Sequence, residues 1–462
     1  MRMTANENKM TARERLASLF DGGTFQEIHS EGVITGKGAI ADRDVYAFAQ
    51  DYSINAGAMT ESMAEKICEV MDMSLRDMVP LIVINESAGA HIQEGVRSLA
   101  GFGEIFKRNV RASGVVPQIS GIFGPCAGGA VYSPALTDFT VMVKDTSYMF
   151  ITGPGVVKAV TGENVTKEEL GGADVHATRS GVAHFAALNE LDAIQTIREL
   201  VGYLPSNNLQ EAPRITTADP ADRQDACLND IVPSNPKKPY DMYKVITSLA
   251  DDGRFLEVHQ GWARNMIVGF ARMDGRSVGI VANQPRILAG VLDSDASRKA
   301  ARFVRFCDAF NIPVVTLVDV PGFLCGTQQE YAGVITQGAK LVYAYAEATV
   351  PKITVVLRKS YGGAHVSMGC KELGADVNFA WPSAQIAVMG AESAAEVISS
   401  DRPDFIEDYK ARISNPSNAL ANGSLDEIIE PSTTRKRVIQ ALEQLAATSN
   451  AGVWKKHDNM PL

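Results

Sequence analysis

Two short glycine-rich stretches are the strongest candidates for chemistry in this sequence. They read GPCAGGAVYSP at 124–134 and KSYGGAHVSMG at 359–369, and each ends an apolar run that opens with Val-Pro. A glycine lets the backbone approach a ligand oxygen closely, and the first N–H groups of a helix carry partial positive charge. Such donors can hold a developing oxyanion. The candidate donors are the backbone N–H groups of Gly128, Gly129, Gly363 and Ala364.

The competing interpretation of each turn is structural, because glycines also permit tight packing of a helix on a strand. The repeated context favours chemistry. In each half of the chain a proline stands nine residues before a glycine, in the pairs Pro80 with Gly89 and Pro313 with Gly322. A second proline stands eleven residues before each turn, in the pairs Pro117 with Gly128 and Pro351 with Gly362.

The sequence is therefore one unit written twice. The offset between matched positions drifts from 230 residues, at Phe25 and Phe255, to 234, at Gly128 and Gly362, as small loop insertions would make it. A period of this length indicates duplicated domains and excludes a solenoid. The polar, proline-rich segment VPSNPKKPYD at 232–241 is typical of a linker, so the predicted domains are 1–233 and 240–462.

Each copy has the rhythm of an α/β fold. Short apolar runs bounded by Gly or Pro predict buried strands, at 80–85, 117–123, 313–319 and 351–357. Helical periods precede the first of these strands in each half of the chain, at 57–71 and 295–310. The first helix is predicted to present Met59, Met63, Ile67 and Val70 on one face. Alternating strands and helices imply crossover units, in which ligands gather where strands end and helices begin.

Composition and the absence of common motifs argue against several classes of function. The net charge of −10 argues against nucleic acid, and six scattered cysteines without a C-x-x-C pair suggest neither a zinc ribbon nor a disulfide framework. The sequence shows no signal peptide and no apolar run long enough for a membrane helix, so a cytoplasmic protein is expected. It contains no H-E-x-x-H motif. NESAG at 85–89 lacks the first glycine of a nucleophile elbow, and GVITGKG at 32–38 fails as a P-loop.

Three blocks carry a family resemblance. They are 98–154, which contains the first turn, 282–327, which contains VDVPGFLCGT, and FAWPSAQIAVMG at 379–390. With them the sequence resembles the carboxyltransferase β subunit of biotin-dependent acyl-CoA carboxylases, nearest the propionyl-CoA and acetyl-CoA group. The resemblance covers nearly the whole chain. It implies two tandem crotonase-like domains and transfer of a carboxyl group from carboxybiotin to the α-carbon of a short-chain acyl-CoA.

The resemblance also implies roles for individual residues. The first turn, Gly128 with Gly129, would hold the thioester enolate, and the second, Gly363 with Ala364, the ureido oxygen of biotin. The implied substrate-binding residues are Gly89, Ala90, Gly322, Phe323 and Val366. In the family an acidic residue at the Val366 position accompanies a preference for propionyl-CoA, and an apolar one accompanies acceptance of acetyl-CoA as well.

The sequence lacks the signatures of biotin attachment and of nucleotide binding, which indicates partner proteins. It has no Met-Lys pair, hence no Met-Lys-Met biotinylation signature, and no nucleotide-binding fingerprint. Biotin and ATP chemistry are therefore expected on a separate biotin carboxylase and carrier subunit. The resemblance implies a dimer-based homo-oligomer, a hexamer, with each site shared between an N-terminal domain and its partner's C-terminal domain. No metal and no membrane insertion are expected.

Two alternatives stay open. The family usually has Gly and Arg where this sequence has Ala88 and His91, which motivates a non-catalytic, CoA-binding assembly subunit. The second alternative is a decarboxylase or transcarboxylase subunit that uses the same site in reverse, because a site that stabilises the enolate serves both directions.

Overall fold

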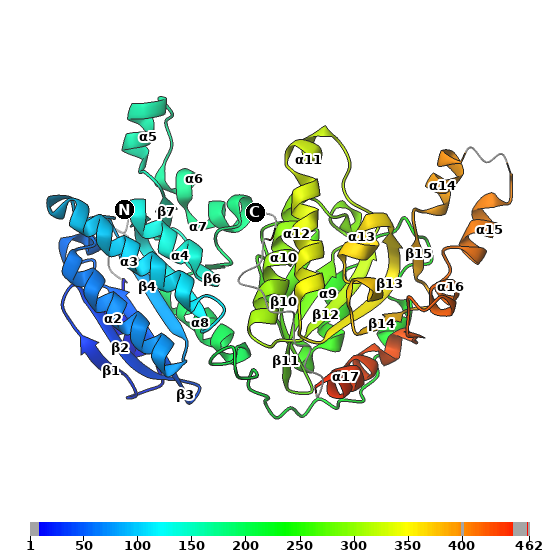
Figure 1. Cartoon of the computed structure of the whole chain (residues 1–462), viewed down its shortest axis with the longest axis horizontal. Coiled ribbons are helices and arrows are strands. Elements are labelled where there is room, and N and C mark those ends of the chain that lie inside the picture. Colours follow the sequence, from blue (N-terminus) through cyan, green and yellow to red (C-terminus); the bar gives the residue numbers. More distant parts are fainter. Residues whose placement is uncertain (1–8, 399–401, 447–459, 461–462) are drawn as a thin grey trace, which may run out of the picture. The chain divides into compact units, whose positions relative to one another are not determined.

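Each half of the chain is built on a mixed sheet of eight strands in the described residues, and the two sheets have matching strand orders. The computed structural model describes residues 9–398, 402–446 and 460. They form two units, Met1–Ala212 with His259–Trp262, and Pro213–Val258 with Ala263–Leu462. Figure 1 shows the elements in chain order. No helix of the described residues is long and apolar enough to cross a membrane.

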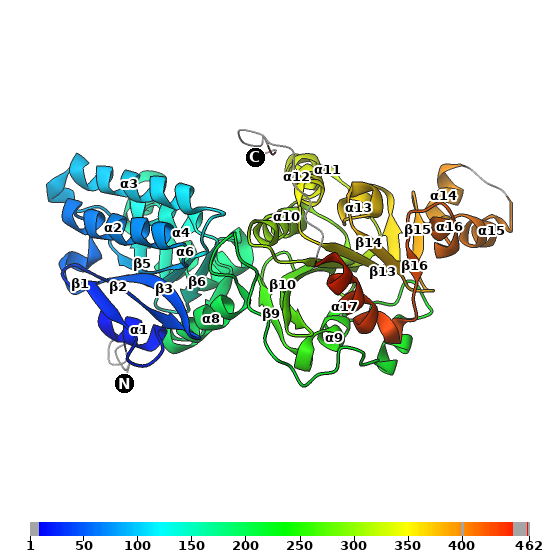
Figure 2. The same cartoon turned by 60° about the horizontal axis from the view of Figure 1, so that its bottom comes forward.

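The sheet of the first unit runs in the order β1-β2-β3-β4-β5-β6-β8, with β7 beside β5. Its strands are β1 (Gln26–His29), β2 (Val33–Ile40), β3 (Arg43–Gln50), β4 (Leu81–Ser87), β5 (Gln118–Ala127), β6 (Phe139–Val143), β7 (Tyr148–Phe150) and β8 (Phe185–Ala187). Its helices are α1 (Ala12–Leu19), α2 (Glu61–Asp77), α3 (Val96–Ala112), α4 (Tyr132–Leu136), α5 (Pro154–Thr161), α6 (Lys167–Gly171), α7 (Ala173–Val175) and α8 (Glu190–Tyr203). In Figure 2, α2 and α3 cover one face of this sheet, and α1 and α8 lie on the other.

The second unit repeats this plan in the order β9-β10-β11-β12-β13-β14-β16, with β15 beside β13. Its strands are β9 (Phe255–Val258), β10 (Met266–Met273), β11 (Arg276–Asn283), β12 (Val314–Val320), β13 (Lys352–Tyr361), β14 (Val377–Ala380), β15 (Gln385–Ala387) and β16 (Glu427–Ile428). Its helices are α9 (Met242–Leu249), α10 (Ser294–Ala309), α11 (Thr327–Tyr331), α12 (Val334–Glu347), α13 (Gly362–Ser367), α14 (Ala391–Val397), α15 (Phe405–Arg412), α16 (Pro416–Ala421) and α17 (Thr434–Leu445). The predicted duplication and the α/β fold class are confirmed.

In helix α2 the predicted spacing of apolar residues forms a buried face. Thr60 caps it, because its side chain accepts a hydrogen bond from the Met63 N–H group. Met63, Ile67 and Met71 are at most 4% exposed and belong to the core that includes strands β3 and β4. The prediction began this helix too early. Met59 is not helical, because it pairs instead with Ala90 in an isolated parallel bridge.

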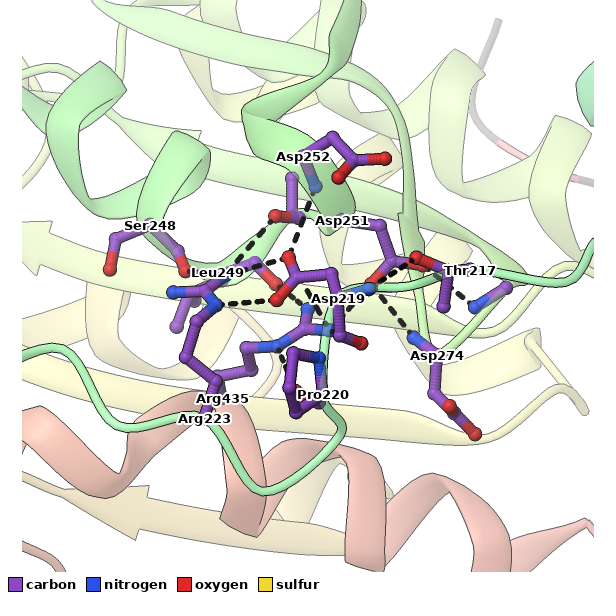
Figure 3. Close-up of polar contacts among 12 residues, drawn as sticks. Thr217, Asp219, Pro220, Arg223, Ser248, Leu249, Asp251, Asp252, Asp274 and Arg435 are labelled. Atoms are coloured by element: carbon purple, nitrogen blue, oxygen red, sulfur yellow. Dashed lines mark hydrogen bonds and ion pairs between the residues drawn. The ribbon is translucent and has the colours of Figure 1, made fainter.

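Residues 213–258 are anchored within the second unit by a buried arginine on α17. The Arg435 guanidinium, 2% exposed, donates to the Asp251 carboxylate at 2.6 Å and to the Leu249 carbonyl at 2.6 Å. Asp251 also accepts from the backbone of the β10–β11 turn, and Asp219 lies 3.8 Å from Arg435 (Figure 3). The segment 232–241, expected as a linker, also lies in this unit. The domain boundary at 233–240 therefore stays a prediction about the duplicated sequence.

We expect Arg435→Ala to destabilise the second unit by about 3–5 kcal/mol, because removal of one member leaves the Asp251 charge buried and unpaired. Urea unfolding followed by tryptophan fluorescence measures this. The matched control is Arg412→Ala, whose side chain is 79% exposed and pairs with Asp408; it should change the free energy of unfolding by less than about 0.5 kcal/mol. Equal unfolding curves for the two variants would contradict the anchoring role.

Candidate functional site

The first glycine turn lies where β5 ends. A short 3-10 helix, η3 (Gly128–Val131), begins directly after Ala127 and leads into α4. Gly128 has φ +63°, a conformation that favours glycine. A Cβ atom on Gly129 would lie 3.1 Å from the Phe102 ring. The turn therefore brings the backbone close to its surroundings and presents the first N–H groups of a helical segment, which have no partner within the helix.

A second turn from β4 lies against the first one. Gly89 has φ +104°, and a Cβ atom there would lie 2.9 Å from the Ala127 carbonyl oxygen. The turn is held from the other side by Met59. The Met59 N–H group donates to the Gly89 carbonyl at 2.8 Å, and the His91 N–H group donates to the Met59 carbonyl at 3.0 Å. The bridge fixes Ala90 between these bonds, so Gly89 and Ala90 are rigidly placed beside the first glycine turn.

The second unit repeats this arrangement 233 residues later. The Leu292 N–H group donates to the Gly322 carbonyl at 3.0 Å, and the Leu324 N–H group donates to the Leu292 carbonyl at 2.7 Å. Strand β13 ends at Tyr361, and α13 begins at Gly362, whose φ of +57° matches that of Gly128. The duplication therefore extends to individual hydrogen bonds around both turns.

Phe323 places its ring beside the second glycine turn. A Cβ atom on Gly363 would lie 3.9 Å from that ring, and one on Gly338 of α12 would lie 3.0 Å from it. The Ser367 hydroxyl donates to the Gly363 carbonyl at 2.9 Å, and the Met368 N–H group donates to the Ala364 carbonyl at 3.1 Å. The Gly363 and Ala364 carbonyls are thus occupied, while the first N–H groups of α13 have no partner within the helix.

A buried carboxylate lies against β5 at Gly124, four residues before the first turn. The Glu86 side chain, at the end of β4, accepts from Arg15 of α1 at 2.7 Å and also pairs with Lys9. Arg15 is 1% exposed and bonds Glu190 at 2.7 and 3.0 Å. Burial works to lower the pKa of Arg15, but its bonds to Glu190 and the charge of Glu86 outweigh burial and raise that pKa. The guanidinium therefore stays charged.

The second unit places Asp319 where the first unit has Glu86. Asp319 is buried at the end of β12 and accepts from the Arg358 guanidinium at 2.9 Å and from the Lys359 N–H group at 3.1 Å. The Asn283 side-chain oxygen accepts from the Asp319 N–H group at 3.2 Å. Glu86 and Asp319 lie 233 residues apart, at matched positions of the duplicated sequence, and neither was predicted as a site residue. The signal that could have pointed to them is an acidic residue near the end of a strand whose earlier residues are mostly apolar.

The cysteine at the first turn is a poor nucleophile. Cys126, two residues before Gly128, is fully buried, and burial raises the pKa of its thiol to about 12. Its sulfur donates to the Ala130 carbonyl at 3.3 Å. The thiol is protonated at neutral pH and turned into the core. The Cys126 thiol is therefore not available as a nucleophile, and the groups that this turn can offer a ligand are its backbone N–H groups.

One group of side chains near the second turn escaped the sequence analysis. His365, Cys370 and Glu372 place their ligand atoms within 4.8 Å of one another, the one group of this kind in the described residues that could hold a metal ion. Burial lowers the pKa of His365. The spacing H-x4-C-x-E matches neither the H-E-x-x-H nor the C-x-x-C pattern of metal ligands. The cluster therefore forms only once α13 and the following turn are folded.

All nine residues predicted for the site lie in the described part of the chain. Gly89, Ala90, Gly128 and Gly129 are neighbours in the first unit. Gly322 and Phe323 adjoin Gly363 and Ala364 in the second. Val366 follows on α13 and is 41% exposed. Their catalytic and binding roles stay predictions.

Comparison with known proteins identifies the family. Residues 4–460 match the carboxyl transferase domain. The chain belongs to the carboxyl transferase domain family. It is 52% identical to the carboxyltransferase subunit of propionyl-CoA carboxylase from Haloferax mediterranei, over 99% of this chain and 94% of that protein. It is also 52% identical to the α subunit of methylmalonyl-CoA decarboxylase from Veillonella parvula, with the same coverage.

A solved structure agrees with this family. The 12S transcarboxylase, in a hexamer structure with hydrolysed methylmalonyl-coenzyme A, is 49% identical and has a TM-score of 0.96, over 98% of this chain and 93% of that one. The resemblance stated from the sequence and the tandem crotonase-like fold are therefore confirmed.

We expect Gly89→Ala to reduce carboxyl transfer by roughly tenfold or more. Alanine is strained at this φ, and its Cβ atom would push Gly89 away from the Ala127 carbonyl, which displaces one turn from the other. The measurement is carboxyl exchange with the purified protein. The control is Gly103→Ala on α3, where a Cβ atom meets nothing within 4 Å and helix propensity favours alanine. Full activity in folded Gly89→Ala protein would show that this contact does not position the site.

Proposed function

We propose that this protein is the carboxyltransferase subunit of a biotin-dependent acyl-CoA carboxylase. It moves the carboxyl group of carboxybiotin, carried on a separate protein, to the α-carbon of propionyl-CoA, acetyl-CoA or both. The observation that carries this proposal is the pair of glycine turns, each presenting backbone donors at the end of a central strand. The family and the named relatives supply the substrate class.

The proposed reaction needs no side chain as a nucleophile or as a base. Carboxybiotin supplies the carboxyl group as CO₂ and then the nitrogen that accepts the α-proton of the acyl-CoA. One C–N bond breaks, one C–C bond forms, and the proton moves from carbon to nitrogen. The Gly128 and Gly129 N–H groups hold the thioester oxygen while its negative charge develops, and Gly363 and Ala364 hold the ureido oxygen. Each donor contributes about 3–4 kcal/mol in a water-excluded site.

The inert Cys126 thiol supports a mechanism without a protein nucleophile. The rigid Met59–Ala90 bridge supports preorganisation, because donors fixed before the substrate arrives need no rearrangement as charge develops. The substrate-binding residues proposed for the acyl-CoA are Gly89 and Ala90 in the first unit. Those proposed for the biotin side and the acyl end are Gly322, Phe323 and Val366.

Partner chains complete the proposed enzyme. We infer a biotin carboxylase and carrier subunit, because this sequence lacks both the biotinylation signature and a nucleotide-binding fingerprint. A homo-hexamer is supported by the hexamer named for the 12S transcarboxylase. The second candidate function, decarboxylation of methylmalonyl-CoA, is supported by the equal identity of the Veillonella parvula subunit. Co-purification with a membrane-embedded partner favours decarboxylation, and co-purification with an ATP-dependent biotin carboxylase favours the carboxylase.

We expect Gly129→Pro to lower turnover at least about a hundredfold, because proline removes the N–H donor. The assay combines purified protein with biotinylated carrier and labelled malonyl-CoA or methylmalonyl-CoA, and it measures carboxyl exchange. Gly129→Ala is the matched control, since it keeps the donor and adds only a Cβ atom 3.1 Å from the Phe102 ring. Its loss should stay below about tenfold. Circular dichroism and light scattering establish folding and assembly for both variants.

Two results would contradict this proposal. Near-normal exchange in a folded, assembled Gly129→Pro protein removes the first turn from the mechanism. Absence of exchange in the wild type, with both thioesters and an active carrier, favours the non-catalytic assembly subunit.

Val366 offers a test of substrate choice. Its apolar side chain is 41% exposed on α13, so we expect wild-type kcat/KM values for acetyl-CoA and propionyl-CoA to differ by no more than about 10 to 200-fold, the range that one methylene gives. Val366→Asp should shift the ratio toward propionyl-CoA, and the conservative Val366→Ile should leave it nearly unchanged. An unchanged ratio in active Val366→Asp protein places selectivity elsewhere.

A further inference from the structure

The segment that follows the second glycine turn folds back on itself and gathers three potential metal ligands. His365 lies on α13, and Cys370 and Glu372 lie at and just inside the 3-10 helix η8 (Lys371–Leu373). We propose that His365, Cys370 and Glu372 bind one zinc ion, which clamps α13 to η8. This site goes beyond the proposed carboxyl transfer, and no step of that reaction passes through the metal. It runs against the expectation from sequence that the chain binds none.

The distances suit a small tetrahedral ion after modest adjustment. The three ligand atoms lie within 4.8 Å of one another. Zinc bonds of about 2.0–2.3 Å to nitrogen, oxygen and sulfur place tetrahedral ligands about 3.3–3.8 Å apart. Cys370 is 3% exposed and fixed in the core, whereas His365 is half-buried and Glu372 is exposed. The two side chains nearer to solvent can therefore close on the fixed sulfur by the remaining ångström or so.

The His365 imidazole is held at one of its two ring nitrogens. Its Nδ1 atom lies 2.8 Å from the Ser360 hydroxyl on β13, which leaves Nε2 as the nitrogen for a metal. A metal-bound histidine is usually fixed in this way by a bond at its other ring nitrogen. Ser360 therefore acts as a positioning residue for this site.

The charges balance for a divalent ion. A Cys370 thiolate and the Glu372 carboxylate together neutralise Zn²⁺, and the thiol releases its proton to solvent when the metal binds. The neighbouring Lys371 side chain pairs with Asp426, so its charge is directed to another carboxylate. The mixture of sulfur, nitrogen and oxygen selects zinc over Mg²⁺ and Ca²⁺, which prefer oxygen alone. With three protein ligands, a water molecule takes the fourth position.

The experiment measures metal binding directly. Chelator-treated full-length protein is dialysed against buffered free Zn²⁺, and bound metal is counted by mass spectrometry. We expect one zinc per chain, and a Co²⁺-loaded sample should show the sulfur-to-metal charge-transfer absorption that a thiolate ligand gives. Zinc should also raise the thermal unfolding midpoint. Cys370→Ser and Glu372→Gln should each lose binding at least tenfold, and Ser360→Ala should weaken it about 10–100-fold.

The matched control is Cys227→Ser, which removes an exposed thiol outside the cluster and should leave binding unchanged. Glu372→Gln changes an exposed side chain, so it keeps the test decisive even if Cys370→Ser does not fold. The proposal is overturned if wild-type protein takes up no zinc at micromolar free metal. It is also overturned if Glu372→Gln binds with wild-type affinity, or if cobalt gives no thiolate absorption.

Discussion

At Gly57 the backbone passes so close to the end of β4 that any Cβ atom would overlap the Glu86 carbonyl oxygen. This approach brings the loop before α2 against the strand, and it allows Met59 to pair with Ala90. The pairing in turn holds Gly89 against the Ala127 carbonyl. The proposed donor turn is thus placed by a chain of backbone contacts in which a side chain at one position would disturb all the later ones.

The second unit places its turn with the same backbone geometry, but the arginine that pairs with its buried carboxylate comes from a different element. Gly290 repeats the close approach, with a Cβ position 2.7 Å from the Asp319 carbonyl. The buried Asp319 carboxylate near the end of β12 is paired with Arg358 from the adjacent strand β13, whereas Glu86 is paired with Arg15 from α1. Burying a carboxylate in the core is costly unless a cation pairs with it. The cation can come from any element that lies close enough. The duplication therefore preserved the acid and the backbone path, and each copy acquired its own arginine.

The sequence predicted correctly those features that depend on residues close together in the chain. Apolar runs bounded by proline located β4, β5, β12 and β13, because burial on both faces leaves a continuous apolar signal. The early helix start at Met59 was wrong, because a bridge to Ala90, distant in sequence, outweighs helical periodicity. Arg15 could not be assigned to Glu86 for the same reason, since 71 residues separate them. The cluster around Cys370 depends on how α13 and η8 fold back, which spacing alone does not reveal.

The proposed role of the backbone donors fits closely similar chains that are named for opposite directions of the reaction. A turn that stabilises the enolate lowers the same barrier for carboxylation and for decarboxylation, because both pass through one transition state. Direction is then set by the free energy that partner chains supply or withdraw, and residues at the turns have no means of choosing it. This accounts for equal identity to a carboxylase subunit and to a decarboxylase subunit. If the turns act as proposed, residues beside them such as Ala88 and His91 have no part in setting the direction of transfer.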